Sequence, residues 1–447
     1  MATVTLPGRS DSPPLSIIPD NQNFPRKSVH RIAVLVTHPI QYFAPLFRTL
    51  AAQPGLDLTV YYESRRGTVP LVDPGFGKAY TWDIPLLEGY PYKYLPGLFR
   101  ETDHTPLTRQ FNPSILNEIT PRRYDAVWVH GYMGNTSRLA ILTALTKGVP
   151  VLMRGESHLR VEPSSATKQY VKDLALRALF RRLAGFLCIG TLNKAYYQHF
   201  GVPEGRLFWC PYTVDNAFFR RHAEALAPQR HELRAQWGIH DDRPVILFAG
   251  KLLAMKQPRL LLEAYRRVRE RRRCALLMAG DGPLRGELEG EIHRCAIPDV
   301  LITGFLNQSE IPKAYAAADL LVLPSRHEPW GLVVNEAMNF SLPIVVSDRV
   351  GCGPDLVTSG VNGEVFEHHS VDALETVLER LVSQTERLRE LGRASLQRIQ
   401  QWGMPETARG VTEALHAVVD QAAVGGSSAQ RTIAPHLKDS QKTGLTL

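Results

Sequence analysis

The sequence predicts an α/β protein with two doubly wound domains, and three observations support this fold class. Short apolar segments alternate with longer helical segments along most of the chain, and they lack polar alternation, as expected of parallel strands buried on both faces. They fall into two series, which a polar region at 212–242 separates. With 447 residues, the chain is also too long for one core and suits two.

The first series predicts a domain over residues 29–215. Its strands are expected at 31–36, 57–62, 125–130, 150–153, 185–190 and 206–211. Helical segments between them include 136–148 and 164–184.

The second series predicts a domain over residues 216–400. Its strands are expected at 244–250, 274–280, 300–304, 319–324, 343–348 and 363–367. Helices near 370–383, 386–400 and 405–422 follow without a further strand. Residues 1–28 and 423–447 show no periodic apolar pattern, so we expect both to be disordered tails.

Composition indicates a globular protein, with 44% hydrophobic and 21% charged residues. The net charge of +8 fits an anionic ligand or an anionic membrane surface. The five cysteines form no CxxC pair, which favours buried thiols in a reducing compartment over disulfides or a metal site. No apolar run reaches the roughly 18 residues of a spanning helix, and residues 1–28 lack a signal-peptide core, so we expect a cytoplasmic protein.

Polar residues follow the strand at 244–250, and ligands of such sheets bind at the carboxyl ends of strands. Gly250 permits a turn, and Lys251 and Lys256 then precede a helix expected to begin near Pro258. Two cations at a helix N-terminus suit a di-anion such as pyrophosphate. The alternative is that both lysines are ordinary solvent-exposed side chains that bind no ligand.

The segment "MAGDGPLRGEL" follows the next strand and predicts a tight turn into a helix at Leu284. It is not a dinucleotide fingerprint, because Arg285 stands where the third glycine is needed. A nicotinamide-dependent oxidoreductase is therefore disfavoured.

The segment "PSRHEPWGLVVNEAM" contains two carboxylates, Glu328 and Glu336. Pro329 favours extended backbone at Glu328, and a helix is expected from Pro329 to about Phe340 with its free N–H groups facing the cleft. Glu336 lies about two turns along this helix, so the pair is not an acid–base dyad. One interpretation is that the two carboxylates bind two hydroxyl-bearing parts of one ligand. The alternative is that Glu336 is an ordinary exposed helix residue and Glu328 a carboxylate at the start of the helix, where the helix dipole favours it.

These segments, together with the "GVNG" turn at 360–363, resemble the sugar-donor half of glycosyltransferase family 4 over residues 240–370. The segment "HPIQYFAPLF" is similar to one that recurs in bacterial members. The resemblance implies a GT-B fold, in which two Rossmann-like domains face a cleft. Residues 29–215 would form the acceptor side and 216–400 the sugar-donor side, and a helix at 401–422 would cross back.

The resemblance also implies roles for the site residues. Lys251 and Lys256 would bind the diphosphate, Glu328 would contact the transferred sugar, and these three form the expected catalytic set. Glu336 would bind the ribose hydroxyls. The family more often has arginine at position 251, and lysine keeps the charge without the bidentate fork. Further sugar-donor-binding residues would be Gly250, Gly282, Trp330, and the backbone N–H groups of Gly331 and Leu332.

The acceptor side resembles the family less closely. His38 and Gln41 stand where many relatives have a glycine-rich turn. Many relatives also place a histidine after the strand at 150–153, where this sequence has "RGESH". Arg154 or Glu156 would replace it, or a shifted register would bring in His158; a structural polar cluster is the alternative.

Two basic segments have two interpretations each. The helix expected at 168–185 carries five cations beside an apolar stripe, and it either rests on an anionic membrane or has a solvated face. The arginine run at 266–273 is equally ambiguous.

The expected function is transfer of a sugar from a nucleoside-diphosphate sugar to a carbohydrate or lipid-linked acceptor, with retention, in polysaccharide or glycoconjugate biosynthesis. Cations and helix N–H groups would stabilise the leaving diphosphate, so no metal or other cofactor and no nucleic acid are expected. The protein would act in the cytoplasm or at the inner face of the membrane. The alternatives are a nucleotide-sugar 2-epimerase or hydrolase on the same fold, and a non-catalytic nucleotide-sugar-binding protein.

Overall fold

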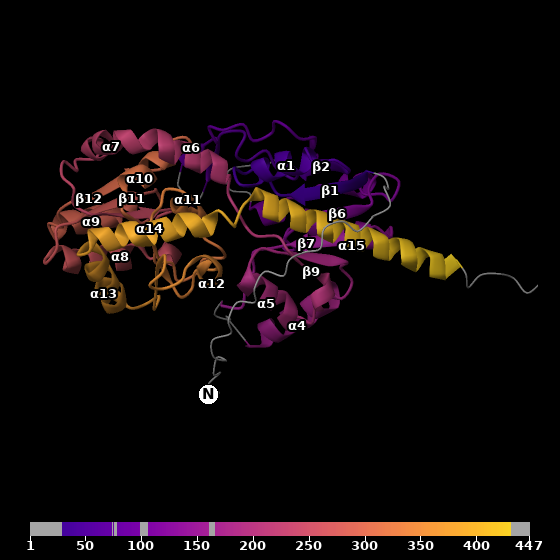
Figure 1. Ribbon diagram of the computed structural model, residues 1–447. Coiled ribbons are helices and arrows are strands. Elements are labelled where there is room, and N and C mark those ends of the chain that lie inside the picture. Colours follow the sequence, from indigo (N-terminus) through magenta and orange to yellow (C-terminus); the bar gives the residue numbers. More distant parts are fainter. Residues whose placement is uncertain (1–28, 74, 76–77, 99–105, 161–165, 431–447) are drawn as a thin grey trace, which may run out of the picture.

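Two α/β lobes lie side by side, and a long C-terminal helix extends along the first of them (Figure 1). The computed structural model describes residues 29–430, except 74, 76–77, 99–105 and 161–165. The tail expected at 1–28 and most of the one expected at 423–447 lie outside the described residues.

The first lobe contains a seven-stranded parallel sheet in the order β5-β2-β1-β6-β7-β8-β9. Its strands are β1 His30–Val36, β2 Leu56–Tyr62, β5 Tyr92–Tyr94, β6 Ala126–His130, β7 Val151–Arg154, β8 Gly185–Cys188 and β9 Leu207–Trp209. All six expected strands are confirmed. The expectation missed β5 and the hairpin β3 (Leu71–Asp73) and β4 (Lys78–Tyr80), because each of these three-residue strands contains a charged residue that interrupts its apolar pattern.

The second lobe contains a six-stranded parallel sheet in the order β12-β11-β10-β13-β14-β15. Its strands are β10 Val245–Ala249, β11 Ala275–Ala279, β12 Val300–Gly304, β13 Leu320–Leu323, β14 Ile344–Ser347 and β15 Gly363–Phe366, as expected. The order reverses between β10 and β13, and in the first sheet between β1 and β6. Crevices form at such reversals, so the two sheets place a site between the lobes.

Helices cover both sheets and bury one apolar face each. Those of the first lobe are α1 Phe43–Ala51, α2 Ile115–Glu118, α3 Asn135–Thr146, α4 Ala166–Phe180 and α5 Thr191–His199. Those of the second are α6 Asn216–Leu226, α7 Arg230–Gln236, α8 Pro258–Arg269, α9 Arg285–Arg294, α10 Ile311–Ala317, α11 Leu332–Met338, α12 Gly353–Leu356, α13 Val371–Val382 and α14 Thr385–Ile399. In α8, for example, Leu261, Leu262, Tyr265 and Val268 recur at helical spacing and are fully buried.

The last helix, α15 (Met404–Gln430), crosses back to the first lobe, as expected, and contacts α1, β8 and β9 (Figure 1). The segment that leads from the first lobe to the second and the segment that leads back bind each other. Thr213 donates to the Trp402 carbonyl, and the Trp402 indole donates to the Tyr212 carbonyl, both at 2.9 Å. The expected end at 422 is wrong, because the helix continues to Gln430. Extending a formed helix costs far less than starting one, and 423–430 contains no proline.

The packing of α15 predicts a specific effect at Gly410. A Cβ there would lie 1.9 Å from the Trp209 carbonyl oxygen and 2.8 Å from the Cys210 sulfur. Gly410→Ala should therefore destabilise the protein by about 1–3 kcal/mol, seen as a lower Tm. Gly290→Ala in α9 is the control: no atom lies within 4 Å of its Cβ, so helix propensity should raise Tm slightly. Equal shifts would contradict the close contact of α15 with β9.

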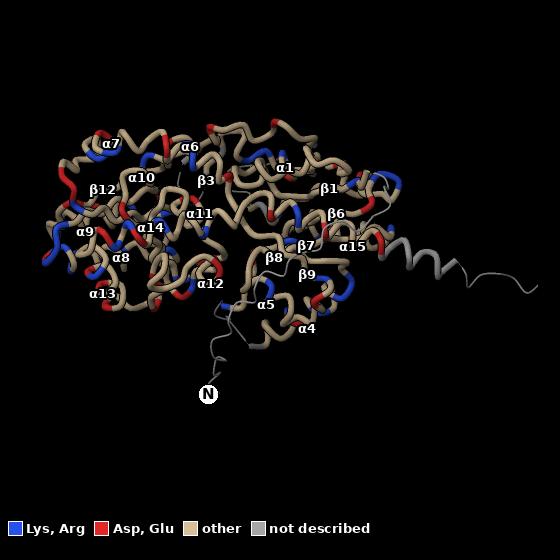
Figure 2. Tube along the Cα trace, viewed as in Figure 1, with Lys and Arg blue, Asp and Glu red and all other residues tan. Residues whose placement is uncertain are grey.

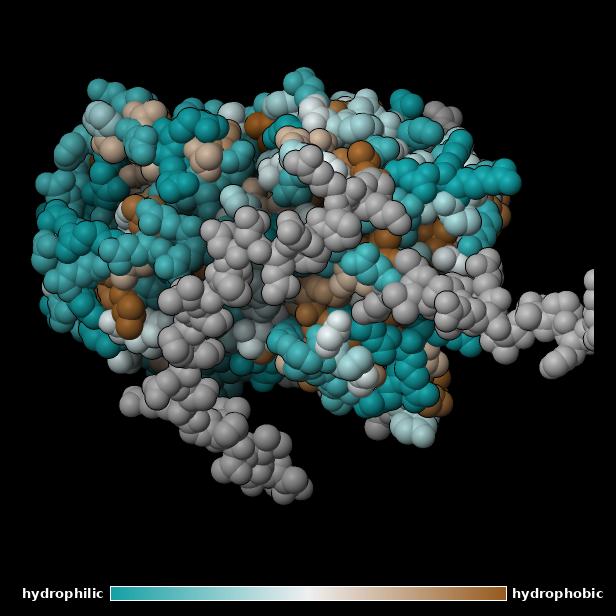
Figure 3. All heavy atoms as spheres, turned by 45° about the vertical axis from the view of Figure 1, so that its right-hand side comes forward, coloured by the Kyte–Doolittle hydropathy of each residue, from teal (hydrophilic) through white to brown (hydrophobic). Residues whose placement is uncertain are grey.

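Two further expectations concern the cysteines and membrane spans. Cys188, Cys210, Cys274 and Cys352 are buried free thiols, as expected, but Cys295 is exposed because it caps α9 at the surface. Within the described ranges, no helix combines the length and apolar character needed to cross a bilayer. Figure 3 shows one face of the molecule, where hydrophilic residues predominate and hydrophobic ones gather in small patches.

Candidate active site

Two adjoining pockets lie between the lobes at the carboxyl ends of the sheets. The large pocket, of about 490 Å³, is lined by His38, Gln41, Lys251, Lys256 and Glu336 among others. The small pocket, of about 310 Å³, adjoins it through shared lining residues that include Gln41, Gly250 and Lys256. Its remaining lining includes Glu156, Glu328, Trp330, Gly331 and Leu332. Most of the expected site residues thus meet in one cleft.

Glycines shape the floor of this cleft at the ends of β10 and β11. Gly250 has a φ of 148°, and a Cβ on Gly280 would lie 1.8 Å from the Gly250 carbonyl oxygen. Only glycines allow the two strand ends to approach this closely. Gly282 does not line either pocket, and a Cβ there would meet the Leu252 backbone at 2.8 Å, so its place is in the turn beneath the cleft.

Lys256 and Glu328 form an ion pair in the small pocket. Lys256 ends a single turn of 3₁₀ helix (Ala254–Lys256), and Gln257 then adopts the left-handed conformation (φ 51°) before Pro258 begins α8. Glu328 is buried, and the Ser325 hydroxyl donates to its carboxylate at 3.4 Å. A flexible cation is therefore held beside a fixed carboxylate.

The helix after Glu328 begins later than the sequence suggested. It starts at Leu332 rather than Pro329, because Gly331 is left-handed (φ 99°) and cannot continue a right-handed helix, and it ends at Met338 rather than Phe340. Trp330 stacks on Trp402 at 5.8 Å and donates to Asn335 at 3.0 Å, which fixes this turn. Gly331 and Leu332 remain in the small-pocket lining, where the N-terminus of α11 faces the cleft.

Glu336 is buried rather than exposed and connects the lobes. Its two carboxylate oxygens accept from Tyr42 at 2.9 Å and from Tyr315 at 2.5 Å. Burial raises the pKa of Glu336 to about 7, although both phenol hydrogen bonds act to lower it. Tyr42 belongs to the first lobe and Glu336 to the second, so this contact spans the cleft.

Of the three acceptor-side candidates after β7, only Glu156 reaches the cleft. It lies 3.7 Å from His130 Nε2, and although burial would raise the pKa of Glu156, the His130 contact, with Tyr212 and Arg154, holds it below its usual value. Arg154 is 1% exposed and lies over the rings of Tyr212 (5.1 Å) and its aromatic neighbours, outside the pocket lining.

His158 acts behind the cleft, against the backbone of Glu328. The Arg160 backbone N–H donates to Nδ1 at 3.1 Å, so Nε2 carries the hydrogen and donates to the Glu328 carbonyl at 3.3 Å. Burial lowers the pKa of His158, which favours this neutral form. His158 therefore holds the backbone of Glu328 in place.

An aromatic cluster at the far end of the large pocket was missed by the sequence interpretation. Tyr80 lies 5.2 Å from Trp82 and 4.9 Å from Phe305, measured between ring centroids. Tyr80 ends the β3–β4 hairpin of the first lobe, whereas Phe305 follows β12 of the second. The only available signal was the pair of aromatic residues in "AYTW".

The described part of the chain contains no group of three or more His, Cys, Asp or Glu side chains placed to hold a metal ion. The charged side chains that line the cleft are Arg66, the two lysines and the carboxylates already described.

Comparison with known proteins gives related sequences. The family model described as "Glycosyl transferases group 1" matches residues 229–398. An alpha-D-kanosaminyltransferase from Streptomyces kanamyceticus is 35% identical over 280 residues, which cover 60% of this chain and 71% of that protein. A D-inositol 3-phosphate glycosyltransferase from Catenulispora acidiphila is 27% identical over 373 residues, covering 77% and 84%.

Solved structures share the fold at low sequence identity. HepE from Anabaena, in complex with UDP and glucose, has a TM-score of 0.65 at 16% identity and covers 87% of this chain and all of its own. Sucrose-phosphate synthase from Thermosynechococcus elongatus has a TM-score of 0.61 at 18% identity, covering 90% and 100%. Both likenesses extend over most of this chain and show that the fold is shared.

Proposed function

Because this chain belongs to the group 1 glycosyl transferases and has a GT-B fold, we propose that it uses a nucleoside-diphosphate sugar and retains the anomeric configuration, as members of family 4 do. The observation that carries the proposal is the joint lining of one cleft by Lys256, Glu328, Glu336 and the N-terminus of α11. A cation and helix N–H groups suit a diphosphate, and a buried carboxylate suits vicinal hydroxyls.

This arrangement suggests an orientation for the sugar donor. The diphosphate lies between Lys251 and Lys256 on one side and the N–H groups of Gly331 and Leu332 on the other. The ribose lies at Glu336, beyond which the aromatic cluster of Tyr80, Trp82 and Phe305 offers faces for the base.

The transferred sugar then lies in the small pocket beside Glu328, opposite Glu156 of the first lobe. As the anomeric bond breaks, negative charge grows on the diphosphate, where Lys256 and the α11 N–H groups already stand. The low pKa of Glu156 keeps it ionised, so it can accept a hydrogen bond from the acceptor hydroxyl. We propose a carbohydrate or lipid-linked acceptor, in polysaccharide or glycoconjugate biosynthesis.

A panel of nucleotide sugars and hydroxyl acceptors tests the proposal, with the product's anomeric configuration read by NMR coupling constants. We expect a glycoside with the configuration of the sugar donor. Inverted product would contradict retention, and free sugar or an epimer without acceptor would favour the hydrolase or epimerase. Nucleotide binding without any turnover would favour a non-catalytic binding protein. Against that alternative, the two related sequences described above are both named as transferases.

Lysines and helix N–H groups stabilise the diphosphate in this proposal, so chelation should matter little. We expect turnover to remain nearly unchanged in excess EDTA. Loss of activity that Mn²⁺ or Mg²⁺ restores would show that a metal ion takes part. The same assay on a protein dialysed against chelator controls for slowly released metal.

The pKa of Glu336 predicts a pH dependence. Ribose hydroxyls donate more strongly to a carboxylate than to a carboxylic acid, so protonation near pH 7 should weaken sugar-donor binding. Lowering the pH from about 8 to about 6 should lower kcat/KM for the sugar donor by about tenfold, since kcat/KM reports the free enzyme. The pH profile of kcat/KM should be flatter in Glu336→Gln. A profile identical to that of the parent would show that Glu336 is not the group that titrates.

A further inference from the structure

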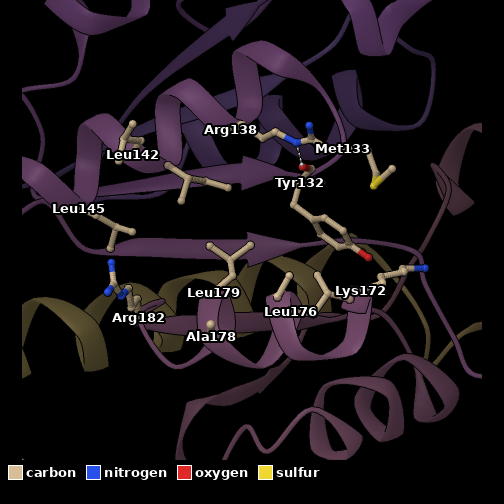
Figure 4. A pocket seen from close by; sticks show the side chains of 12 residues that line it. Tyr132, Met133, Arg138, Leu142, Leu145, Lys172, Leu176, Ala178, Leu179 and Arg182 are labelled. Atoms are coloured by element: carbon tan, nitrogen blue, oxygen red, sulfur yellow. Dashed lines mark hydrogen bonds between the residues drawn. The ribbon is translucent and has the colours of Figure 1, made fainter. Parts of the chain in front are cut away.

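An apolar groove of the first lobe lies between α3 and α4, outside both pockets of the cleft (Figure 4). Its volume is about 720 Å³, and its walls include Ile141, Leu142, Leu145, Leu176 and Leu179. Leu142 is 59% exposed, although it lies at the centre of α3. An apolar groove open to solvent is typical of an interaction surface.

The exposed face of α4 extends this apolar surface. Tyr170, Val171 and Leu174 are 71%, 62% and 60% exposed, and Ala175 and Ala178 continue the same face at helical spacing. The inner face of α4 buries Phe180 against the sheet. The helix is thus apolar on two sides, which the lobe's own core does not require.

Cations surround the groove, and carboxylates do not pair with them. Arg138, Lys172 and Arg182 line it, and Arg181 lies beside it; among the described residues, none of these four forms an ion pair. Asp173 is the one acidic residue in the sequences of α3 and α4, and Gln169 donates to it at 2.6 Å. Arg138 instead donates to the Tyr132 carbonyl (Figure 4).

The other basic segment, 266–273, has a different environment. Arg266 and Arg267 pair with Glu263, Arg271 pairs with Glu375 and Glu379, and acidic and basic residues intermix around α8 and α13 (Figure 2). This segment is neutralised within the fold. The charge around the α3–α4 groove is not, and it therefore remains available to an anionic partner.

The groove also lies next to the cleft. Tyr132 and Met133, at its rim, follow β6, and His130 at the end of that strand faces Glu156 in the small pocket. A surface bound at the groove would thus meet the acceptor side of the cleft.

We propose that the α3–α4 face docks on an anionic lipid bilayer, with acyl chains entering the groove and phosphate head groups contacting Arg138, Lys172, Arg181 and Arg182. The apolar groove matches the acyl-chain layer of a membrane interface, and the cationic rim matches its layer of anionic head groups. The corollary that the acceptor is lipid-linked rests on the proposed function, whereas the docking does not.

The test is flotation of the full chain with vesicles of phosphatidylcholine, with or without about 30% phosphatidylglycerol, and without any nucleotide sugar. We expect binding to the anionic vesicles that weakens at high salt. Lys172→Gln combined with Arg182→Gln should weaken it about 25-fold, since each cation near such a surface contributes a factor of about five. Val171→Ser combined with Leu174→Ser should also weaken it.

Two exposed sites on the second lobe provide matched controls: Val361→Ser, at a residue 57% exposed, and Lys313→Gln. Both should bind vesicles like the parent. Equal binding to neutral and anionic vesicles, or no loss in either α4 variant, would overturn the proposal. So would α4 variants that alter only self-association, because a second copy would then be the occupant. The vesicle experiment requires no transfer activity, so a failed transfer assay would not change its result.

Discussion

Lys256→Ala is expected to lower kcat by roughly 10²-fold or more, the largest effect of any single change proposed for this chain. The side chain lies in the small pocket against Glu328, at the place assigned to the leaving diphosphate. Negative charge on the diphosphate grows towards the transition state, so the Lys256 cation stabilises the transition state more than the ground state. The loss should therefore appear in kcat more than in the KM for the sugar donor.

The matched control is Lys313→Ala, which removes an exposed lysine that pairs with Glu310 at the surface. It should leave kcat unchanged. Lys256→Ala also leaves the buried Glu328 carboxylate without its cation, so its Tm must be compared with the parent before kinetics are interpreted. A variant that melts like the parent and keeps its kcat would remove Lys256 from the mechanism.

Glu336→Gln is expected to raise the KM for the sugar donor by about 10- to 100-fold, the range for losing hydrogen bonds to a charged group, with kcat changing much less. The ribose hydroxyls do not change during the reaction, so the contact contributes equally to ground and transition states. Glutamine is preferred to alanine because alanine would leave the hydroxyls of Tyr42 and Tyr315 without their acceptor.

Two comparisons separate this result from indirect effects. Tyr42→Phe removes one hydrogen bond to Glu336 and keeps the carboxylate, so its KM should change less than that of Glu336→Gln. Glu310→Gln, at an exposed carboxylate, should change neither constant. Loss of kcat with an unchanged KM in Glu336→Gln would mean that Glu336 takes part in the chemical step.

The sequence predicted most strands of the two sheets because they lie in short runs of mainly apolar residues. It also predicted which residues lie at the exits of β10 and β13, since parallel strands direct their carboxyl ends to one edge. Lys256, Glu328 and Glu336 were found in this way. Glu336 could not be recognised as buried, because its partner Tyr42 lies 294 positions away along the chain and on the other lobe.

Two further differences have the same cause, which is contact between distant segments. His158 and Glu156 differ by two positions in sequence, yet one holds the Glu328 backbone and the other faces the cleft. The basic segments around α4 and at 266–273 are both rich in cations, but carboxylates of α8 itself and of α13 neutralise the second segment. Periodicity within one segment carries no information about such partners.

Calorimetric titration of the full chain with nucleoside diphosphates, including UDP, GDP and ADP, measures whether the cleft holds the nucleotide part of a sugar donor. We predict that one of them binds with a stoichiometry of about one, as expected for a single cleft site. The double variant Lys256→Ala with Glu336→Gln should bind it at least about tenfold more weakly, and Val361→Ser should bind it normally. Absence of binding by every nucleoside diphosphate, or equal affinity in the double variant, would show that the cleft is not the site of a nucleotide sugar.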